Sequence, residues 1–311
     1  MILLLAEPGE QTTDYLEKRL QERILPYQRL NVEEFTSAKF NFQINQSEEK
    51  VVIGSQARFT GVFVKYHKPI GSKKLETVPQ EFQKFVTLEV KDSLLGSLLC
   101  SDAVFINLPE NSFASSIKVA QLRLARNVGF LIPDTLISTS KSELIKFWKS
   151  KQGNIVTKAI HQGWVADTDK PNEHLVMFTN EVNAESLVEL EKINFPPILF
   201  QEAIRKFADL RVVVVGKKCF TSVIKSPSID WRTDGPVTAK SSRYDLHSNI
   251  EKMCVELVEN MGLQLGVIDL VIREDGEIFF LEINQQGGWL WMEQELNHPI
   301  RDAIIARLLG E

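Results

Sequence analysis

The chain has 311 residues and a formal net charge of −5, with 43% hydrophobic and 25% charged residues. This length favours two or three sub-domains over a single core, and the composition is typical of a globular protein. The charge excludes a global basic field that would recruit nucleic acid or an anionic membrane, and no apolar run approaches the length of a membrane span.

The first third of the chain predicts a small α/β domain, because predicted strands and helices alternate along it. Its opening, MILLLAEPG, lacks a basic leader and is too short for a signal peptide, so residues 2–5 are interpreted as a buried strand. Residues 81–100 have a helical periodicity that places Phe82, Phe85 and Leu88 on one side, with Leu95 and Leu99 as further candidates for that side. The other predicted elements here are a helix over 14–23, strands over 61–66 and 103–106, and short strands or loops over 31–35, 40–44 and 50–53.

Two lysines in the middle of the chain are candidate phosphate ligands. Lys118 lies near the start of a helix predicted over 116–128 and ended by Gly129. Cations are usually favoured at the C-terminal end of a helix, so a lysine at the N-terminal end is unusual. It is weak evidence for a site, because most such lysines are simply exposed to solvent. Lys158 lies on the apolar side of a strand predicted over 154–160, where a partly desolvated ammonium is a common phosphate ligand.

Other polar groups are weaker candidates. Gln201 and Glu202 lie inside an apolar run whose backbone can face a flat heterocycle. Asp209 and Arg211 share one face of the next strand, although an Asp-x-Arg pair is more often a surface ion pair. The cluster Lys65, His67 and Lys68 can contact an anionic substrate, although a solvated strand end is the commoner role.

The remaining predicted elements are strands over 130–139, 174–179, 198–204, 209–216 and 219–225, helices over 141–149, 183–190, 248–261 and 299–309, and loops over 161–164 and 226–246.

A β-hairpin over residues 267–283 organises the last part of the chain. Asp275-Gly276 between two apolar runs predicts a two-residue turn, because both residues tolerate positive φ. Glu274 would then pair with Glu277, and counting outward places Asp269 opposite Glu282. Asn284 follows on the same face, two residues after Glu282.

Two carboxylates that face each other across strands are destabilising unless a counter-charge joins them. Oxygen ligands of this kind suit Mg²⁺, so the hairpin predicts a magnesium site. An exposed face with two solvated acids is the alternative, and a longer turn would move Asp269 and Glu282 apart. Val271, Ile278 and Phe280, which the same alternation places on this face, argue against exposure.

These residues together resemble the ATP-grasp superfamily of carboxylate-amine ligases over the whole chain. The matches follow the superfamily's order and are Lys118, Lys158 in IVTKAI, the segment ILFQEAI over 198–204, Asp209-Leu210-Arg211 with Gly216, and Asp269 with Glu282-Ile283-Asn284. The resemblance implies an α/β (α+β) chain with the ATP-grasp fold. Its parts would be an N-terminal α/β domain over 1–115, a central α+β sub-domain over 116–195 and a C-terminal one over 196–311, with ATP clasped between antiparallel sheets.

Within the superfamily the chain is most similar to the graspetide synthetases, the microviridin-type ligases that macrocyclise ribosomal peptides. The similar stretches are Asn107-Leu108-Pro109, Lys118 with Gln121-Leu122, residues 129–135, Asp230-Trp231-Arg232, and residues 282–300. Where many members carry a basic pair after the strand over 61–66, this chain has His67-Lys68.

This resemblance implies a role for each candidate residue. Lys118 and Lys158 would bind nucleotide phosphates, Gln201, Glu202, Ala203 and Ile204 would meet the adenine, and Asp209 would hold the ribose. Asp269, Glu282 and Asn284 would hold Mg²⁺, and Arg211 would act with Lys158 in catalysis by stabilising the transferred phosphoryl group and the acyl phosphate.

The implied activity is ATP-dependent ring closure in a ribosomal precursor peptide. An Asp or Glu side chain becomes an acyl phosphate, which a Thr or Ser hydroxyl or a Lys amine attacks to form an ω-ester or ω-amide. The alternative is a RimK-like ligase that adds an amino acid to a protein or a small acid, and a nucleotide-binding scaffold without activity is a third reading. The resemblance also implies a homodimer. A location in the reducing cytoplasm is expected because Cys100, Cys219 and Cys254 are odd in number and widely spaced, which does not fit a disulfide framework.

Overall fold

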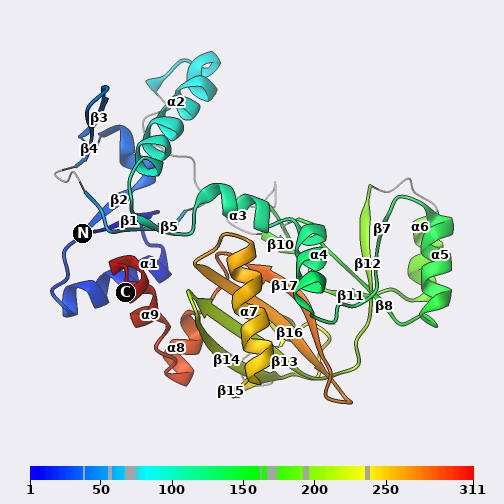
Figure 1. Cartoon of the computed structure of the whole chain (residues 1–311). Coiled ribbons are helices and arrows are strands. Elements are labelled where there is room, and N and C mark those ends of the chain that lie inside the picture. The colour runs from blue at the N-terminus through cyan, green and yellow to red at the C-terminus, as the bar shows by residue number, and fades with distance from the viewer. Residues whose placement is uncertain are drawn as a thin grey trace. The chain divides into compact units, whose positions relative to one another are not determined.

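The computed structural model describes residues 1–37, 39–54, 58–66, 75, 77–161, 163–166, 174–191, 196–234 and 239–311. The chain divides into two compact units (Figure 1). The first contains Met1–Ser112, Gly262–Leu265 and Gly288–Glu311, and the second contains Phe113–Met261 and Gly266–Gly287.

The first unit is built on a parallel sheet with the strand order β2-β1-β5-β6. Strand β1 is fully buried, as expected for an apolar first strand. Helix α9 packs against β5 and β6, and a Cβ at Gly61 would lie 2.4 Å from the carbonyl oxygen of Leu308. Only glycine therefore allows this approach. The elements are β1 (Ile2–Ala6), α1 (Gln11–Glu22), β2 (Tyr27–Asn31), the 3-10 helix η1 (Val32–Ser37), β3 (Phe40–Ile44), β4 (Glu49–Ile53), β5 (Gly61–Lys65), α2 (Gln80–Leu99), β6 (Val104–Ile106), α8 (Leu290–Leu296) and α9 (Ile300–Leu309).

The predicted inner side of α2 is wrong except at Leu95, which is 5% exposed, whereas Leu99 is 47% exposed. Phe82, Phe85 and Leu88 are 54%, 61% and 48% exposed, whereas Leu94 and Leu98 in the second half of the helix are fully buried in the core of the first unit. The helix extends beyond the sheet (Figure 1), so these side chains of its first half are not covered by the described residues of this unit. Periodicity identified the helix correctly but not the part of it that meets a core.

A buried asparagine ties the short segment Gly262–Leu265 to the rest of the first unit. The side chain of Asn107 accepts hydrogen bonds from the backbone N–H groups of Gln264 (2.8 Å) and Leu265 (3.0 Å), and donates one to the carbonyl of Leu265 (2.8 Å). It is only 4% exposed. The first unit therefore depends on one amide to satisfy three backbone groups.

We expect Asn107→Ala to destabilise the protein by about 2–4 kcal/mol, because three backbone groups lose a buried partner. Urea unfolding measures this loss. Asn111→Ala is the matched control, since Asn111 makes one bond to the same segment, with the carbonyl of Gly262, at the surface. Equal stability losses in the two variants would contradict the role given to Asn107.

The second unit contains two antiparallel sheets. One has the order β11-β8-β12-β7 and the other β15-β14-β13-β16-β17, while β9 and β10 form a separate pair. Helix α3 (Pro109–Ser115) leads into this unit, α5 packs on β7, and α4 and α7 pack on the five-stranded sheet. The elements are α4 (Lys118–Val128), β7 (Thr135–Ser138), α5 (Lys141–Ser150), β8 (Ile155–Lys158), β9 (Trp164–Ala166), β10 (His174–Val176), β11 (Asn180–Glu181), α6 (Ala184–Glu191), β12 (Ile198–Glu202), β13 (Lys206–Val215), β14 (Lys218–Lys225), the 3-10 helix η3 (Trp231–Thr233), β15 (Lys240–Arg243), α7 (Ser248–Asn260), β16 (Leu265–Arg273) and β17 (Ile278–Asn284).

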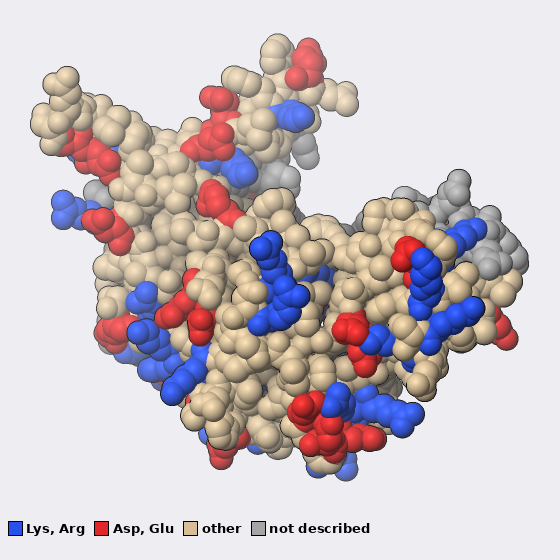
Figure 2. All heavy atoms as spheres, turned by 45° about the vertical axis from the view of Figure 1, so that its right-hand side comes forward, with Lys and Arg blue, Asp and Glu red and all other residues tan. Residues whose placement is uncertain are grey.

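Basic and acidic side chains lie intermixed on the face shown in Figure 2, which agrees with the modest net charge. Among the described residues, no helix is both long enough and apolar enough to cross a membrane.

Candidate functional site

The two acids of the β16–β17 hairpin face each other as predicted, because two departures from the expected hairpin cancel. The turn has three residues rather than two: Arg273, not Glu274, bonds to Glu277 through its backbone N–H, and Gly276 takes the positive φ of 91°. This shifts the pairing by one residue. A β-bulge at Leu281 then shifts it back, so that Asp269 pairs with Glu282.

The bulge also changes which neighbours share the acids' face. Leu281 lines the same cavity as Glu282, and Phe280 instead packs against Phe130, with ring centroids 5.8 Å apart. The expectation that Phe280 shields the acids is therefore wrong. Leu281 takes that place, because a bulge puts two successive side chains on one side of the sheet.

Each of these acids already has a cationic partner from another element. Arg211 on β13 donates to both oxygens of Asp269, at 2.7 and 2.9 Å. Lys118, at the first position of α4, lies 3.0 Å from Glu282 and also donates to the carbonyl of Ala159. A metal ion is therefore not required to offset the repulsion between the two acids, since Arg211 and Lys118 supply counter-charges.

Burial and these partners move the pKa values of the two acids in opposite directions. Burial alone would raise the pKa of Glu282, but Lys118 and Lys158 lower it to about 2. Burial raises the pKa of Asp269, against the opposing effect of Arg211. Glu282 is thus held ionised and is the better anchor for a cation.

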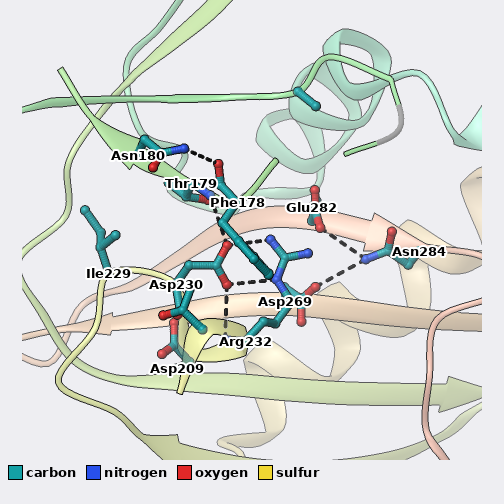
Figure 3. Close-up of polar contacts among 12 residues, drawn as sticks. Phe178, Thr179, Asn180, Asp209, Ile229, Asp230, Arg232, Asp269, Glu282 and Asn284 are labelled. Atoms are coloured by element: carbon teal, nitrogen blue, oxygen red, sulfur yellow. Dashed lines mark hydrogen bonds and ion pairs between the residues drawn. The ribbon is translucent and has the colours of Figure 1, made fainter. Parts of the chain in front are cut away.

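The third predicted ligand, Asn284, completes a convergent set of side chains. Its amide nitrogen donates to Asp269 and to Glu282, at 3.2 Å in each case (Figure 3). A rotation of the amide by half a turn would present its oxygen to the same point, since oxygen and nitrogen are interchanged by that flip. No set of three His, Cys, Asp or Glu side chains gathers among the described residues. Two carboxylates and one amide oxygen fit Mg²⁺, which tolerates few protein ligands.

Asp269, Glu282 and Asn284 line a cavity of about 290 Å³ in the second unit, whereas Arg211 is not among its described lining residues. Lys158 at the end of β8 also lines it, and among the described residues no hydrogen bond to its ammonium is seen. Burial lowers the pKa of Lys158 to about 8. A largely desolvated ammonium that makes no direct ion pair within the described part of the chain is suited to a phosphate. The cavity is lined by Lys118, Lys158, Ala159, His161, Gly163, Met177, Thr179, Asp209, Leu210, Ile229, Asp230, Trp231, Arg232, Asp269, Leu270, Leu281, Glu282 and Asn284.

The sequence reasoning gave no role to Arg232, which the structure places in this cavity. Its guanidinium donates to both oxygens of Asp230, at 2.8 and 2.6 Å, and Asp230 also accepts from the backbone N–H of Thr179 at 3.1 Å (Figure 3). Burial would raise the pKa of Asp230, but Arg232 and these N–H groups lower it to about 2. A rigidly held arginine at a cavity wall fits an anionic substrate. The Asp-x-Arg spacing within a polar loop was the signal available in the sequence.

A smaller cavity of about 70 Å³ adjoins the first and contains the predicted adenine and ribose residues. Gln201, Glu202, Ala203, Ile204 and Asp209 all line it. Gln201 is buried and donates to the hydroxyl of Thr135 at 2.8 Å.

Asp209 is held by a neighbour that the sequence reasoning did not identify. Burial raises its pKa to about 6, and the ammonium of Lys206 opposes this from 2.6 Å. Asp209 and Arg211 share a face but do not pair with each other, because Lys206 and Asp269 are their respective partners.

The remaining basic candidates are only partly described. Lys65 ends β5, where burial lowers its pKa. His67 and Lys68 lie outside the described residues, as does Gln162 in the loop over 161–164, whose His161 and Gly163 line the larger cavity.

Comparison with known proteins identifies a family and several similar structures. The family model described as a RimK-like ATP-grasp domain matches residues 117–308. The macrocyclase MdnC from Microcystis aeruginosa MRC, solved with its precursor peptide MdnA, is 26% identical; the match covers 100% of this chain and 99% of that one, with a TM-score of 0.83. No curated protein matches the chain in sequence.

Two further structures have a similar fold at lower identity. A RiPP-associated ATP-grasp ligase from Chryseobacterium gregarium, in complex with ADP and with leader and core peptides, is 24% identical over 99% of this chain and 96% of that one, with a TM-score of 0.86. The ATP-grasp ligase PsnB, complexed with a minimal precursor, Mg and ADP, is 19% identical over 99% and 97%, with a TM-score of 0.78.

Proposed function

Because the chain belongs to the RimK-like ATP-grasp family, we propose that it is a peptide macrocyclase acting on a ribosomal precursor peptide. The fold is the ATP-grasp fold, in which a parallel α/β sheet is followed by antiparallel sheets, and the class is that of the ATP-grasp ligases, which use ATP and Mg²⁺. The observation that carries the proposal is the full-length likeness to MdnC, a macrocyclase solved with its precursor peptide.

The charges of the two cavities support a nucleotide in a defined orientation. The adenine would lie against Gln201, Glu202, Ala203 and Ile204, and the ribose against Asp209. The phosphates would then extend into the larger cavity towards Lys118 and Lys158. Asp269, Glu282 and Asn284 would hold Mg²⁺, which supplies charge neutralisation on the phosphate oxygens.

The chain's own residues mostly position groups and stabilise charge, as phosphoryl transfer requires. A side-chain carboxylate of the peptide attacks the terminal phosphorus of ATP, giving an acyl phosphate and ADP. Arg232, held by Asp230, is placed to receive that carboxylate, while Lys158 neutralises the moving phosphoryl group. A hydroxyl or amine of the same peptide then attacks the carbonyl, and phosphate leaves with the nucleophile's proton. Arg211 would stabilise the charge on the carbonyl oxygen.

Further proposals accompany this activity. The chain would divide into an N-terminal domain over 1–115, a central sub-domain over 116–195 and a C-terminal sub-domain over 196–311, of which residues 262–265 and 288–311 group with the first compact unit. The active protein would be a homodimer located in the cytoplasm. The partner would be a peptide with a leader segment and a core that carries Asp or Glu together with Thr, Ser or Lys.

Mass spectrometry of candidate precursor peptides incubated with the protein, ATP and Mg²⁺ tests this function. We expect the loss of one water per ring, and reactions without ATP serve as the control. A mass increase equal to an added amino acid would instead support the RimK-like alternative. Unchanged peptides together with ATP hydrolysis that peptide does not stimulate would contradict both activities.

The lowered pKa of Lys158 makes nucleotide affinity depend on pH. Bound phosphates favour the charged ammonium, so binding above the free pKa of about 8 takes up a proton. We expect ADP affinity to be nearly constant below about pH 7 and to fall roughly tenfold between about pH 7 and pH 9. Calorimetry with MgADP measures this fall. Lys158→Arg, which stays charged, should show a flat profile, and Lys158→Met should bind weakly at every pH. A flat profile for the unmodified protein would show that Lys158 does not contact phosphate.

A further inference from the structure

Gln121 of α4, which has no role in the proposed reaction, contacts the backbone of β17, the strand that carries Glu282 and Asn284. Strand β17 is an edge strand of its sheet. Its outer edge is bridged at Phe279 by Leu131, and the N–H of Phe280 donates to the carbonyl of Leu131 at 2.8 Å, but no strand of the described residues pairs with it beyond that point. At Ile283, Gln121 takes the place of a partner strand. Its amide oxygen accepts from the N–H of Ile283 at 3.2 Å, and its amide nitrogen donates to the carbonyl of Ile283 at 2.9 Å.

The amide of Gln121 is itself held in one orientation. Its nitrogen also donates to the carbonyl of Ser115 at 2.7 Å, and the residue is only 3% exposed. Both ends of the amide are therefore satisfied, and reversing it would oppose like groups at all three bonds. A buried amide with three bonds of this kind resists movement more than an apolar contact does.

The contact between Gln121 and β17 lies at Ile283, directly between Glu282 and Asn284. The strand is irregular one residue before Glu282, because Leu281 forms the bulge, and bulges re-aim the side chains that follow them. Gln121 holds the backbone on the far side of Glu282. One helical turn earlier on α4, Lys118 contacts Glu282 itself at 3.0 Å. The same helix thus holds both the backbone and the carboxylate of this region.

We propose that Gln121 is a positioning residue that sets the aim of Glu282 and Asn284 towards the bound cation. This inference rests on the proposed function, because it takes those two side chains as Mg²⁺ ligands. Groups that orient metal ligands typically contribute 10- to 100-fold in metal affinity when they are removed.

The test is calorimetric binding of ADP to the full chain, with Mg²⁺ and separately with EDTA. For Gln121→Met we expect MgADP affinity to fall at least about tenfold, with metal-free ADP affinity within about twofold of the unmodified protein, because Lys118 keeps its bond to Ala159. Leu122→Ala is the matched control. It removes a buried side chain next to Gln121 on α4 and should lower the Tm without changing the ratio of the two affinities.

The outcomes separate this inference from the function beneath it. If the unmodified protein binds ADP no more tightly with Mg²⁺ than with EDTA, the metal assignment itself is wrong. If it does bind more tightly and Gln121→Met keeps that ratio, Gln121 is only a structural residue and the inference is overturned. Should Gln121→Met fail to fold, Gln121→Asn keeps the amide but is one methylene too short to reach Ile283. It should show the same loss, and an unchanged ratio there overturns the inference equally.

Discussion

Glu282→Gln is expected to lower the rate of ring closure by at least about 10³-fold while the protein keeps its fold. The substitution preserves size but removes the negative charge that Lys118 and Lys158 hold ionised. A metal ion contributes several kcal/mol of charge stabilisation in the transition state, and about 4 kcal/mol corresponds to that factor. Lys118 keeps its hydrogen bond to the carbonyl of Ala159, so that ammonium is not left without a partner.

Peptide product measured by mass spectrometry over time gives the rate, and thermal unfolding checks the fold. Glu277→Gln is the matched control, because Glu277 lies on the same hairpin at its exposed end, paired with Arg273. Activity should be unchanged in that variant. Turnover near the normal rate in Glu282→Gln would refute the metal assignment. Asp269→Asn should lose as much activity, but it would also leave Arg211 beside a neutral partner and is the less clean test.

Arg211→Lys is expected to reduce product formation at least about 10²-fold, while ADP affinity changes little. That factor is typical of losing one donor aimed at developing charge. Lysine keeps the positive charge beside Asp269 but cannot reproduce the planar guanidinium, of which one nitrogen contacts both oxygens of Asp269. The expected defect is therefore in kcat rather than in nucleotide binding.

Arg211→Ala should show the same catalytic loss together with lower stability. Asp269 would remain buried without its cation, which typically costs about 3–5 kcal/mol. The exposed arginine of the hairpin provides the control, since Arg273→Lys should change neither activity nor stability measurably. If Arg211→Lys weakens ADP binding as much as it slows the reaction, Arg211 acts on the nucleotide rather than on the acyl group.

The hairpin illustrates how far local patterns reach. Alternation and the Asp-Gly pair predicted two strands and the facing acids, and the pairing of Asp269 with Glu282 is confirmed. The three-residue turn and the bulge at Leu281 were not predicted, because turn length and bulges depend on how the strands twist and pack. The order of the candidate residues also predicted the ATP-grasp fold correctly, since several weak matches in one order are specific together.

The pairing of the basic side chains at the site could not be predicted from the sequence. Lys118, Lys158 and Arg211 were identified as candidates, but the pairing of Arg211 with Asp269 joins residues 58 positions apart. Arg232 and Lys206 received no role, because an arginine in a polar loop and a lysine at a strand start look like ordinary surface residues. Similarly, periodicity could not show that Phe82 and Phe85 lie on the part of α2 that extends beyond the sheet.

Short stretches of sequence were enough to predict the local elements and the kinds of side chain at the site, namely hard oxygens on one hairpin and cations on other elements. These follow from short-range rules of turn chemistry and alternation, which act within a few residues. Only the tertiary structure decided which cation neutralises which acid, and that Gln121 closes the strand edge behind Glu282. Such pairings arise where segments distant in the chain are buried together, because burial makes each charge and each backbone group require a partner.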